Sequence, residues 1–189
     1  MLASVFIGTS LDGFIARRNG EYDFLPADGG EPHGYTEFMA GIDTLVIGRK
    51  TFETVVAFAE WPYARKRVVV LSSRALDLSK VGMGGRDARR TAGKTPALPW
   101  VEQMRGEPAH IIAKLEASGA KSLYVDGGDT IQRFLRAGLI QRLIITRVPV
   151  LIGEGISLFG TLPRDVRLEH VATTSYRSGL VKSEYRVIS

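Results

Sequence analysis

Residues 122–148 constrain the fold more strongly than any other stretch of the chain. They read SLYVDGGDTIQRFLRAGLIQRLIITRV: a β-type run ends at Asp126, two glycines follow, and a helical pattern leads to a second β-type run. The helical pattern places Ile131, Phe134 and Leu135 on one face and ends in glycine. A strand, a helix and a strand in this order are typical of a parallel α/β unit. The paired glycines indicate either a tight turn or a backbone that something approaches closely.

The same alternation covers most of the chain. Strands are predicted at residues 3–8, 43–48, 67–73, 122–127, 142–153, 167–176 and 180–188. Helices are predicted at residues 34–41, 49–58, 108–119 and 129–138. The valine-rich run at 67–73 predicts a strand that is buried on both faces. The last two strands flank a turn at 177–179, which predicts an antiparallel hairpin. The sequence therefore predicts an α/β domain with a mostly parallel, mixed sheet.

Composition excludes several classes of protein. The 189 residues are enough for one domain, and 44% hydrophobic with 24% charged residues is ordinary for a globular chain. No apolar run approaches the roughly 20 residues that span a bilayer. The N-terminal segment lacks a basic leader, so we interpret it as a first strand and not a signal peptide. Without cysteines, disulfides and cysteine-ligated zinc are excluded, and the three histidines are far apart. We expect a cytoplasmic protein without a bound metal or a membrane segment.

The net charge of +5 is weak support for a nucleic-acid partner. The dense basic cluster lies in a glycine-rich stretch at 82–99 and consists of Arg86, Arg89, Arg90 and Lys94. It is either a solvated loop or a nucleic-acid patch, and the missing apolar periodicity favours the loop. We therefore expect no nucleic-acid partner and treat about 75–107 as a variable insertion in a single domain.

Three predicted strands end in similar chemistry. Gly48-Arg49-Lys50-Thr51 follows one strand, Ser72-Ser73-Arg74 follows Leu71 in another, and Gly127-Gly128-Asp129-Thr130 follows Asp126 in a third. Parallel strands would bring these ends to one sheet edge, where open α/β folds bind ligands. Two of the turns open helices, whose free N–H groups suit phosphate, and the arginines and the lysine add cationic donors. The pattern fits a ligand with a pyrophosphate and a further phosphate.

A plainer interpretation of these turns stays open. Gly-Gly after a strand is most often only a turn, and Asp129 or Thr130 would then be a helix N-cap. The first strand is not followed by G-x-G-x-x-G, so the Rossmann fingerprint is absent.

At this point several segments resemble one family. SLDGFIA (10–16), IGRKTFE (47–53), YVDGG (124–128) and PVLIGEG (149–155), in this order, are similar to the dihydrofolate reductase-like fold. Within that fold, the chain resembles the C-terminal reductase domain of the riboflavin biosynthesis deaminase–reductase. The match spans nearly the whole chain except about 75–107. The resemblance implies a three-layer α/β/α fold with a mostly parallel mixed sheet and a C-terminal antiparallel hairpin.

The resemblance also implies an activity. It implies an NADPH-dependent reductase that transfers a hydride to a C=N or C=O carbon of a small pterin- or pyrimidine-like heterocycle. In riboflavin biosynthesis this is the 5-amino-6-(5-phosphoribosylamino)uracil reductase reaction. The deaminase half, with its cysteine and histidine zinc ligands, is absent from this sequence. A non-catalytic nucleotide-binding module on the same fold is the alternative, and relatives of this type imply a homodimer.

The resemblance carries over cofactor positions residue by residue. Gly8, Ile15 and Ala16 match positions that flank the nicotinamide. Gly48, Arg49, Lys50 and Thr51 match the first phosphate-binding helix start, and Leu71, Ser72, Ser73 and Arg74 match the loop around the adenosine and its 2′-phosphate. Asp126, Gly127, Gly128, Asp129 and Thr130 match the pyrophosphate turn. Dihydrofolate reductases have a cis peptide here, so one is expected at Asp126–Gly127 or Gly127–Gly128, with the Asp126 carboxylate pointing away from the pyrophosphate.

The proton source and the substrate contacts are less clearly marked. Dihydrofolate reductase has an acidic residue early in its first helix, where this chain has Gly34 or a neighbour, so folate reduction is not implied. Candidates for proton handling are Asp12, Glu37, Tyr35 and Glu154, with Asp12 and Glu37 preferred. Asp12 could instead form an Asp-Gly turn, and Glu37 could lie on a solvated helix face. Tyr35, Phe38 and Thr146 are candidate substrate contacts, although the first two could be core residues and Thr146 an ordinary strand threonine.

Overall fold

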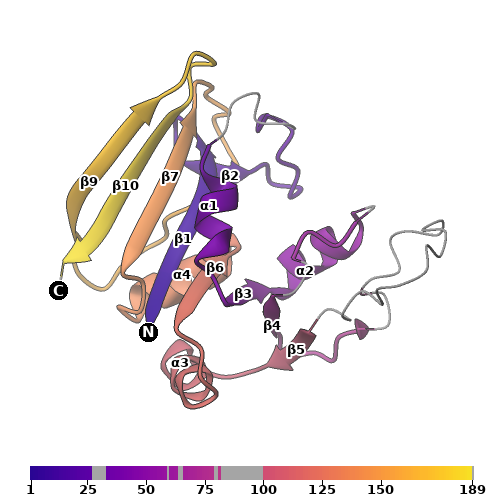
Figure 1. The fold of residues 1–189 in the computed structure, drawn as a ribbon. Helices are drawn as coiled ribbons and strands as arrows, with labels where there is room; N and C mark the ends of the chain where they lie inside the picture. The colour runs from indigo at the N-terminus through magenta and orange to yellow at the C-terminus, as the bar shows by residue number, and fades with distance from the viewer. Residues whose placement is uncertain (27–32, 59, 64–65, 79–80, 82–99, 189) are drawn as a thin grey trace, which may run out of the picture.

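A large twisted sheet organises the protein, and helices lie against it (Figure 1). The computed structural model describes residues 1–26, 33–58, 60–63, 66–78, 81 and 100–188. The strands of the main sheet are β1 (Leu2–Ser10), β3 (Thr44–Gly48), β4 (Arg67–Leu71), β5 (Trp100–Met104), β6 (Ser122–Asp126), β7 (Arg142–Val148), β9 (Arg167–Ser175) and β10 (Val181–Ile188). The helices are α1 (Tyr35–Ala40), α2 (Arg49–Val56), α3 (Pro108–Ala117) and α4 (Gly128–Arg136). A small second sheet pairs β2 (Phe14–Ala16) with β8 (Ile156–Ser157).

Strand order confirms the predicted mixed sheet. Within the described residues the order is β5-β4-β3-β6-β1-β7-β10-β9. The pairs from β5 through to β7 are parallel, whereas β10 runs antiparallel to both β7 and β9. The last two strands therefore form the predicted antiparallel hairpin at one side of a parallel core.

Side-chain alternation along the strands builds the two interfaces of a three-layer structure. Leu45 and Ile47 of β3 pack with α1 and α2, whereas Val46 between them packs with α3 and α4. Such central strands are buried on both faces, and Val68 and Val70 of β4 are fully buried as the valine-rich run predicted. The three-layer α/β/α arrangement of the dihydrofolate reductase-like fold is confirmed.

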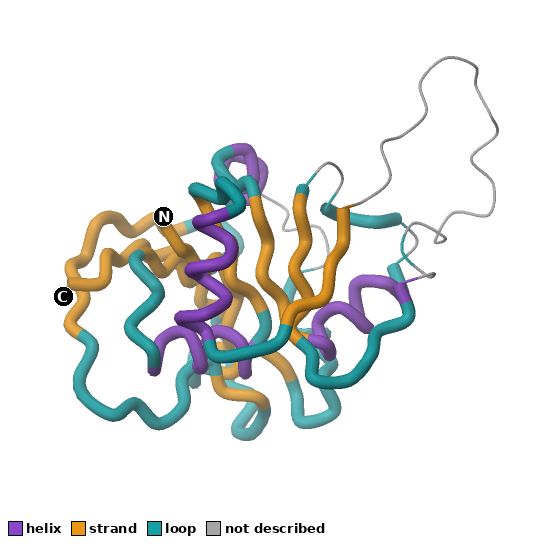
Figure 2. Tube along the Cα trace, turned by 90° about the horizontal axis from the view of Figure 1, so that it is seen from below, coloured by secondary structure: helices purple, strands orange, loops and turns teal. Residues whose placement is uncertain are grey.

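The β9–β10 hairpin leaves this layered core. All nine residues of β9 are exposed, and Figure 1 shows the hairpin at the side of the sheet farthest from β5. Both chain ends lie on this side of the molecule (Figures 1 and 2). The outer strand β9 is thus exposed, whereas β10 is mostly half-buried against the parallel strands.

Some element boundaries differ from the sequence prediction. β7 ends at Val148 and not at 153, because Pro149 has no N–H to continue the ladder and the chain turns, with Val150 N–H donating to Val148 O at 2.8 Å. β5 lies inside the range 75–107 that the sequence analysis treated as an insertion, and it pairs in parallel with β4 as an edge strand. The basic cluster at 86–94 lies outside the described residues. No helix in the described part of the chain is long and apolar enough to cross a membrane.

Candidate functional site

The three predicted strand ends are neighbours on one edge of the sheet. Gly48 pairs with Leu71, and Ile47 pairs with Asp126, so the turns after β3, β4 and β6 lie side by side. α2 and α4 begin directly after two of these strands. Neither helix start has a side-chain cap among the described residues, so Asp129 and Thr130 do not act as the N-cap that the plainer interpretation required. Two uncapped helix N-termini therefore offer N–H groups at the same edge.

Close packing explains the glycines of this edge. Gly127 has φ +92°, and a Cβ there would collide with Thr51 Oγ1 at the start of α2. A Cβ on Gly128 would lie 2.9 Å from Ile15 Cδ1, and one on Gly48 would lie 2.9 Å from Thr130 Oγ1. The glycines thus let the turn after β6 pack against α2 and against the β2–β8 sheet.

The expected cis peptide is not found. Within the described residues every peptide bond is trans, so that prediction was wrong. The chain reverses after Asp126 through the positive φ of Gly127, a backbone conformation that only glycine adopts at low cost. The turn therefore needs Gly127 for its positive φ, and not for the cis peptide that the resemblance implied.

Asp126 lies on the face of β6 that also carries Tyr124, which is the α1 and α2 side of the sheet. Its carboxylate accepts a hydrogen bond from the Gly127 N–H at 2.8 Å. Burial raises the pKa of Asp126 to about 6, and the Gly127 N–H opposes this shift. Because an ordinary aspartate titrates near 3.8, the raised pKa of Asp126 brings the change of its charge closer to neutral pH.

A cluster of aromatic rings lies near Asp126 on the same face of the sheet. The Phe6 ring lies 5.4 Å from Tyr35 and 5.0 Å from Phe38, and the Phe38 ring lies 5.2 Å from Tyr124. Tyr124 donates its hydroxyl hydrogen bond to Phe6 O at 2.9 Å. Phe38 is buried and belongs to the core, whereas Tyr35 is 41% exposed. Of the two predicted aromatic contacts, Tyr35 therefore has a ring surface that a ligand can reach.

Two further tyrosines share this environment. Burial, and then the charge of Asp126, raise the pKa of Tyr35 to about 12 and raise the pKa of Tyr63 further. Tyr22 contributes to the shift at Tyr63 as well. The sequence analysis missed Tyr63, because a single tyrosine between α2 and β4 carries no motif that would mark it.

Thr146 has an unsatisfied hydroxyl. It lies in β7 opposite Gly8 of β1, and its Oγ1 is buried without a hydrogen-bond partner among the described residues. A buried hydroxyl without a partner is costly, so a polar ligand group at this position would be stabilised. A Cβ on Gly8 would lie 2.9 Å from Leu25 Cδ2, so the Leu25 side chain occupies the space beside Gly8.

The other positions predicted to flank a nicotinamide adjoin the turn after β6. Ala16 is buried and pairs with Ile156, and Ile15 beside it contacts Gly128. The structure thus joins two groups of predicted cofactor residues that are more than 100 positions apart in the sequence.

Gln103 organises the loop that was assigned to the adenosine end. Ser72 Oγ donates to Arg74 O at 2.7 Å and accepts from the Arg74 N–H at 3.1 Å. Gln103 Nε2 donates to Ser72 O at 2.9 Å and to Arg74 O at 2.8 Å, and its Oε1 accepts from the Leu76 N–H. Ser73 and Arg74 stay exposed at the tip. The sequence analysis missed Gln103, because it lies in the half-buried edge strand β5 within the presumed insertion.

The other predicted cations differ in their surroundings. Arg49 forms an ion pair with Glu53 at 2.6 Å, one helical turn later, whereas Lys50 is exposed at the start of α2. Both lie beside Thr51 and hence beside the turn at Gly127.

Asp12 and Glu37, the two preferred proton-handling residues, are both exposed. The Asp12 carboxylate accepts N–H groups of Ile152 at 3.2 Å and Gly153 at 2.8 Å. The Ser10 hydroxyl, and then these amides, lower the pKa of Asp12. Glu37 is exposed on α1 and lines a cavity of about 470 Å³. Asp12 anchors the loop after β7, and the role of either residue in proton transfer stays a prediction.

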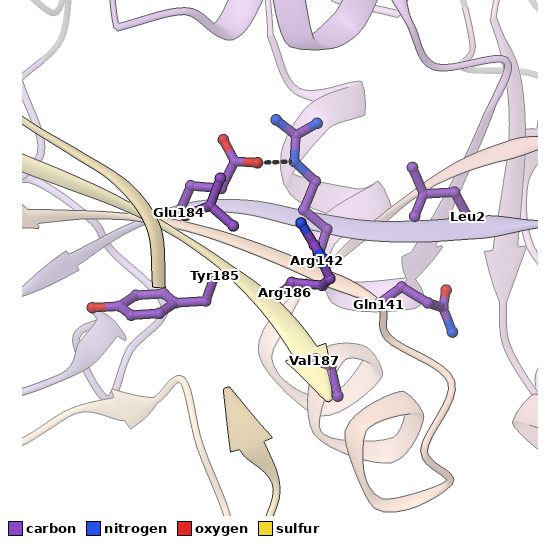
Figure 3. A pocket seen from close by; sticks show the side chains of 8 residues that line it. Leu2, Gln141, Arg142, Glu184, Tyr185, Arg186 and Val187 are labelled. Atoms are coloured by element: carbon purple, nitrogen blue, oxygen red, sulfur yellow. Dashed lines mark hydrogen bonds and ion pairs between the residues drawn. The ribbon is translucent and has the colours of Figure 1, made fainter. Parts of the chain in front are cut away.

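Two cavities of the described part of the chain lie away from the strand-end edge. One of about 300 Å³ lies at the seam of β7 and β10, where Arg142 Nε bonds Glu184 at 2.7 Å (Figure 3). The cavity beside Glu37 adjoins it and shares Leu2, Arg142 and Glu184 with it. The phosphate site predicted at this edge stays a prediction; helix N–H groups and turns can bind phosphate on a surface and need no enclosed cavity.

Comparison with known proteins agrees with this architecture. The chain is 29% identical over 176 residues to the uncharacterized protein YwjB of Bacillus subtilis (strain 168), covering 91% of this chain and 90% of that one. A protein from Shewanella sp. PV-4 assigned to riboflavin biosynthesis is 34% identical, with a TM-score of 0.84 over the full length of both chains. Dihydrofolate reductase from Enterococcus faecalis in complex with NADP(H) has a TM-score of 0.62 at 18% identity, over 100% of this chain and 97% of that one, which shows the shared fold. The model of the RibD C-terminal domain matches residues 4–182. The chain belongs to the RibD C-terminal domain family.

Proposed function

We propose that this protein is an NADPH-dependent reductase that transfers a hydride to a C=N or C=O carbon of a small substrate with a pterin- or pyrimidine-like heterocycle. The observation that carries the proposal is the convergence of the three strand-end turns and two uncapped helix starts on one edge, beside Asp126 and Tyr35. Membership of the RibD C-terminal domain family supports a reductase. The NADP(H) complex of the Enterococcus faecalis enzyme, which shares the fold, supports the choice of cofactor.

The residues at this edge suit a phosphorylated dinucleotide. Helices α2 and α4 both begin at this edge, and Lys50 adds a cation, so this part would hold the pyrophosphate. Ser72, Ser73 and Arg74 would hold the 2′-phosphate, since arginine binds a phosphate monoester through two N–H groups. Gly8, Ile15 and Ala16 would flank the nicotinamide, which supplies the hydride when NADPH is bound.

The protein would supply orientation and a proton. Hydride addition to a C=N or C=O carbon leaves a nitrogen or oxygen that must take up one proton. Asp126 is suited to deliver it, because a carboxyl group with a pKa near 6 is partly protonated close to neutral pH. Tyr35 would stack on the heterocycle, and the Thr146 hydroxyl would gain the hydrogen bond that it lacks.

Family membership supports a choice of substrate class. A pyrimidine such as 5-amino-6-(5-phosphoribosylamino)uracil is the first candidate, in line with the assignment of the Shewanella protein to riboflavin biosynthesis. A non-catalytic nucleotide-binding module is the second candidate function. Both bind NADPH, but only a reductase oxidises it when a substrate is added.

Cofactor selectivity provides the test. We expect the purified protein to bind NADPH more tightly than NADH, and Arg74→Ala to weaken NADPH binding about tenfold or more while NADH binding changes little. Gln103→Leu should also weaken NADPH binding, but by less, because it frees the loop without removing a charge. Arg136→Ala, at the far end of α4, is the matched control. Fluorescence titration of each variant measures the effect, and equal losses for NADPH and NADH would contradict a 2′-phosphate contact at Arg74.

We also propose that a second copy of the chain covers the β9–β10 hairpin. Leu168 and Val171 are 40% and 47% exposed, and Leu168 pairs with Val187 on one face. Leu168→Glu should convert a dimer into monomers, whereas Thr174→Glu, on the opposite face of the exposed strand β9, should not. Sedimentation velocity distinguishes the two states. A wild-type monomer at micromolar concentration would rule the proposal out.

A further inference from the structure

The short helix α1 carries Tyr35 but has little to hold its start. It spans six residues, and its N-cap is Gly34 with φ 79° and no side-chain cap. A helix this short is not stable on its own, so contacts from the rest of the protein fix its place. The ring contacts of Tyr35 and Phe38 hold the inner face of the helix on the sheet. They leave open what fixes the backbone at its first residue.

Lys182 of β10 provides that contact. Its Nζ donates a hydrogen bond to His33 O at 2.9 Å, across 149 residues of sequence. The same Nζ lies 5.9 Å from the centre of the Tyr176 ring, and the centroids of the Tyr176 and His33 rings are 4.7 Å apart in an edge-to-face arrangement. A Cβ on Gly34 would lie only 3.1 Å from Nζ, so the ammonium group sits directly against the helix start. A hydrogen bond from a charged donor in a half-buried place is among the stronger single contacts in a protein.

The position of Lys182 in the sheet connects the two predicted substrate contacts. In the β7–β10 ladder Lys182 lies directly opposite Thr146. Its side chain crosses from there to the residue pair His33 and Gly34, which immediately precedes Tyr35. Thus one side chain spans the distance between the strand that carries the unsatisfied hydroxyl and the helix that carries the exposed ring.

We infer that Lys182 is a positioning residue for the substrate side of the site, an inference that rests on the proposed function. It fixes the first turn of α1, and thereby the Tyr35 ring, relative to Thr146. The strand-end edge follows β3, β4 and β6, which lie on the other side of β1 from the strand that carries Lys182. Loss of the lysine should therefore affect the substrate and not NADPH.

Three variants test this role. Lys182→Met keeps the length of the side chain and removes its charge and donors, whereas Lys182→Arg keeps both. Arg186→Met is the matched control on the same strand, because Arg186 is 66% exposed and forms its ion pair with Glu169. In Lys182→Met, hydrogen exchange of the amides in residues 34–41 should speed up about tenfold, a change that reflects local opening of α1. Lys182→Arg and Arg186→Met should exchange like the wild type.

A kinetic measurement adds the functional side. With 5-amino-6-(5-phosphoribosylamino)uracil and NADPH, Lys182→Met should raise KM about tenfold with kcat within about twofold, as expected for weakened ground-state positioning. The Kd for NADPH should stay unchanged. Unchanged exchange of residues 34–41 in Lys182→Met would overturn the inference, and so would an equal loss of NADPH affinity. Absence of NADPH oxidation by the wild type would defeat the proposed function alone, because the exchange measurement needs no substrate.

Discussion

Gly127→Ala should lower the melting temperature by about 10 °C and weaken NADPH binding at least tenfold, which is about 1.4 kcal/mol. Gly127 has φ +92° and ψ 133°, a region that costs other residues about 1–3 kcal/mol. Its Cβ would in addition collide with Thr51 Oγ1, so the start of α2 must move. Because α2 and α4 both present N–H groups at this edge, a shift between them separates the two phosphate-binding helix starts.

Gly138→Ala separates these two causes. Gly138 also has a positive φ, of 68°, but a Cβ there meets no atom within 4 Å. This control should lose about 1–2 kcal/mol and keep its affinity for NADPH. Thermal unfolding and fluorescence titration of both variants give the comparison. If Gly127→Ala resembles Gly138→Ala in both measurements, the contact with Thr51 does not shape the cofactor site.

Asp126→Asn should change the dependence of both stability and activity on pH. The pKa of Asp126 is raised from 3.8 to about 6 in the folded protein, so between these values the folded state holds a proton that the unfolded state has released. This group therefore stabilises the protein below about pH 4, and the contribution is lost as pH rises through about 6, by at most about 3 kcal/mol. Asparagine is neutral throughout and can still accept the Gly127 N–H. The variant should be more stable than the wild type at pH 8 and lose this advantage near pH 4.

The rate of NADPH oxidation tests the role of Asp126 in catalysis. If its carboxyl group delivers the proton, the wild-type kcat should fall as pH rises through about 6. Asp126→Asn should show a rate that is about 10²–10⁴ lower and has no step near pH 6. Denaturant unfolding at pH 4 and pH 8 measures the stability effect separately. A wild-type step near pH 6 that persists in the variant would assign the proton to another group.

Local pattern was sufficient to predict the parallel core. The valines of β4, the proline that opens α3 and the glycines after β6 each specify their element within a few residues. From parallel strands, the three strand ends were then predicted to lie at one edge, where the structure has them. β5 was missed, because it is a half-buried edge strand with weak alternation that follows a glycine-rich stretch.

The chemistry of the site was less accessible from sequence. Asp126 was predicted as a cofactor residue, but its raised pKa depends on burial by a fold assembled from distant segments, and it shares its surroundings with Tyr35 and Tyr63. The sequence left open whether Asp12 forms a turn or handles a proton. Only the three-dimensional fold shows that its carboxylate accepts hydrogen bonds from the N–H groups of Ile152 and Gly153. Contacts between residues more than 100 positions apart leave no local signal. Gln103 also contacts its loop across 29 to 31 positions, which again leaves no local signal.

The central place of β1 has a consequence for how the chain folds. β1 lies between β6 and β7, and Ala3 pairs with Leu123, about 120 residues later. During synthesis the first strand therefore leaves the ribosome long before either neighbour exists, and its apolar residues stay without a partner until then. Such non-local parallel pairing folds slowly and exposes strand edges to aggregation. The sheet closes only after β7 has been made, so a chain truncated before that strand should remain unfolded and become a client of chaperones.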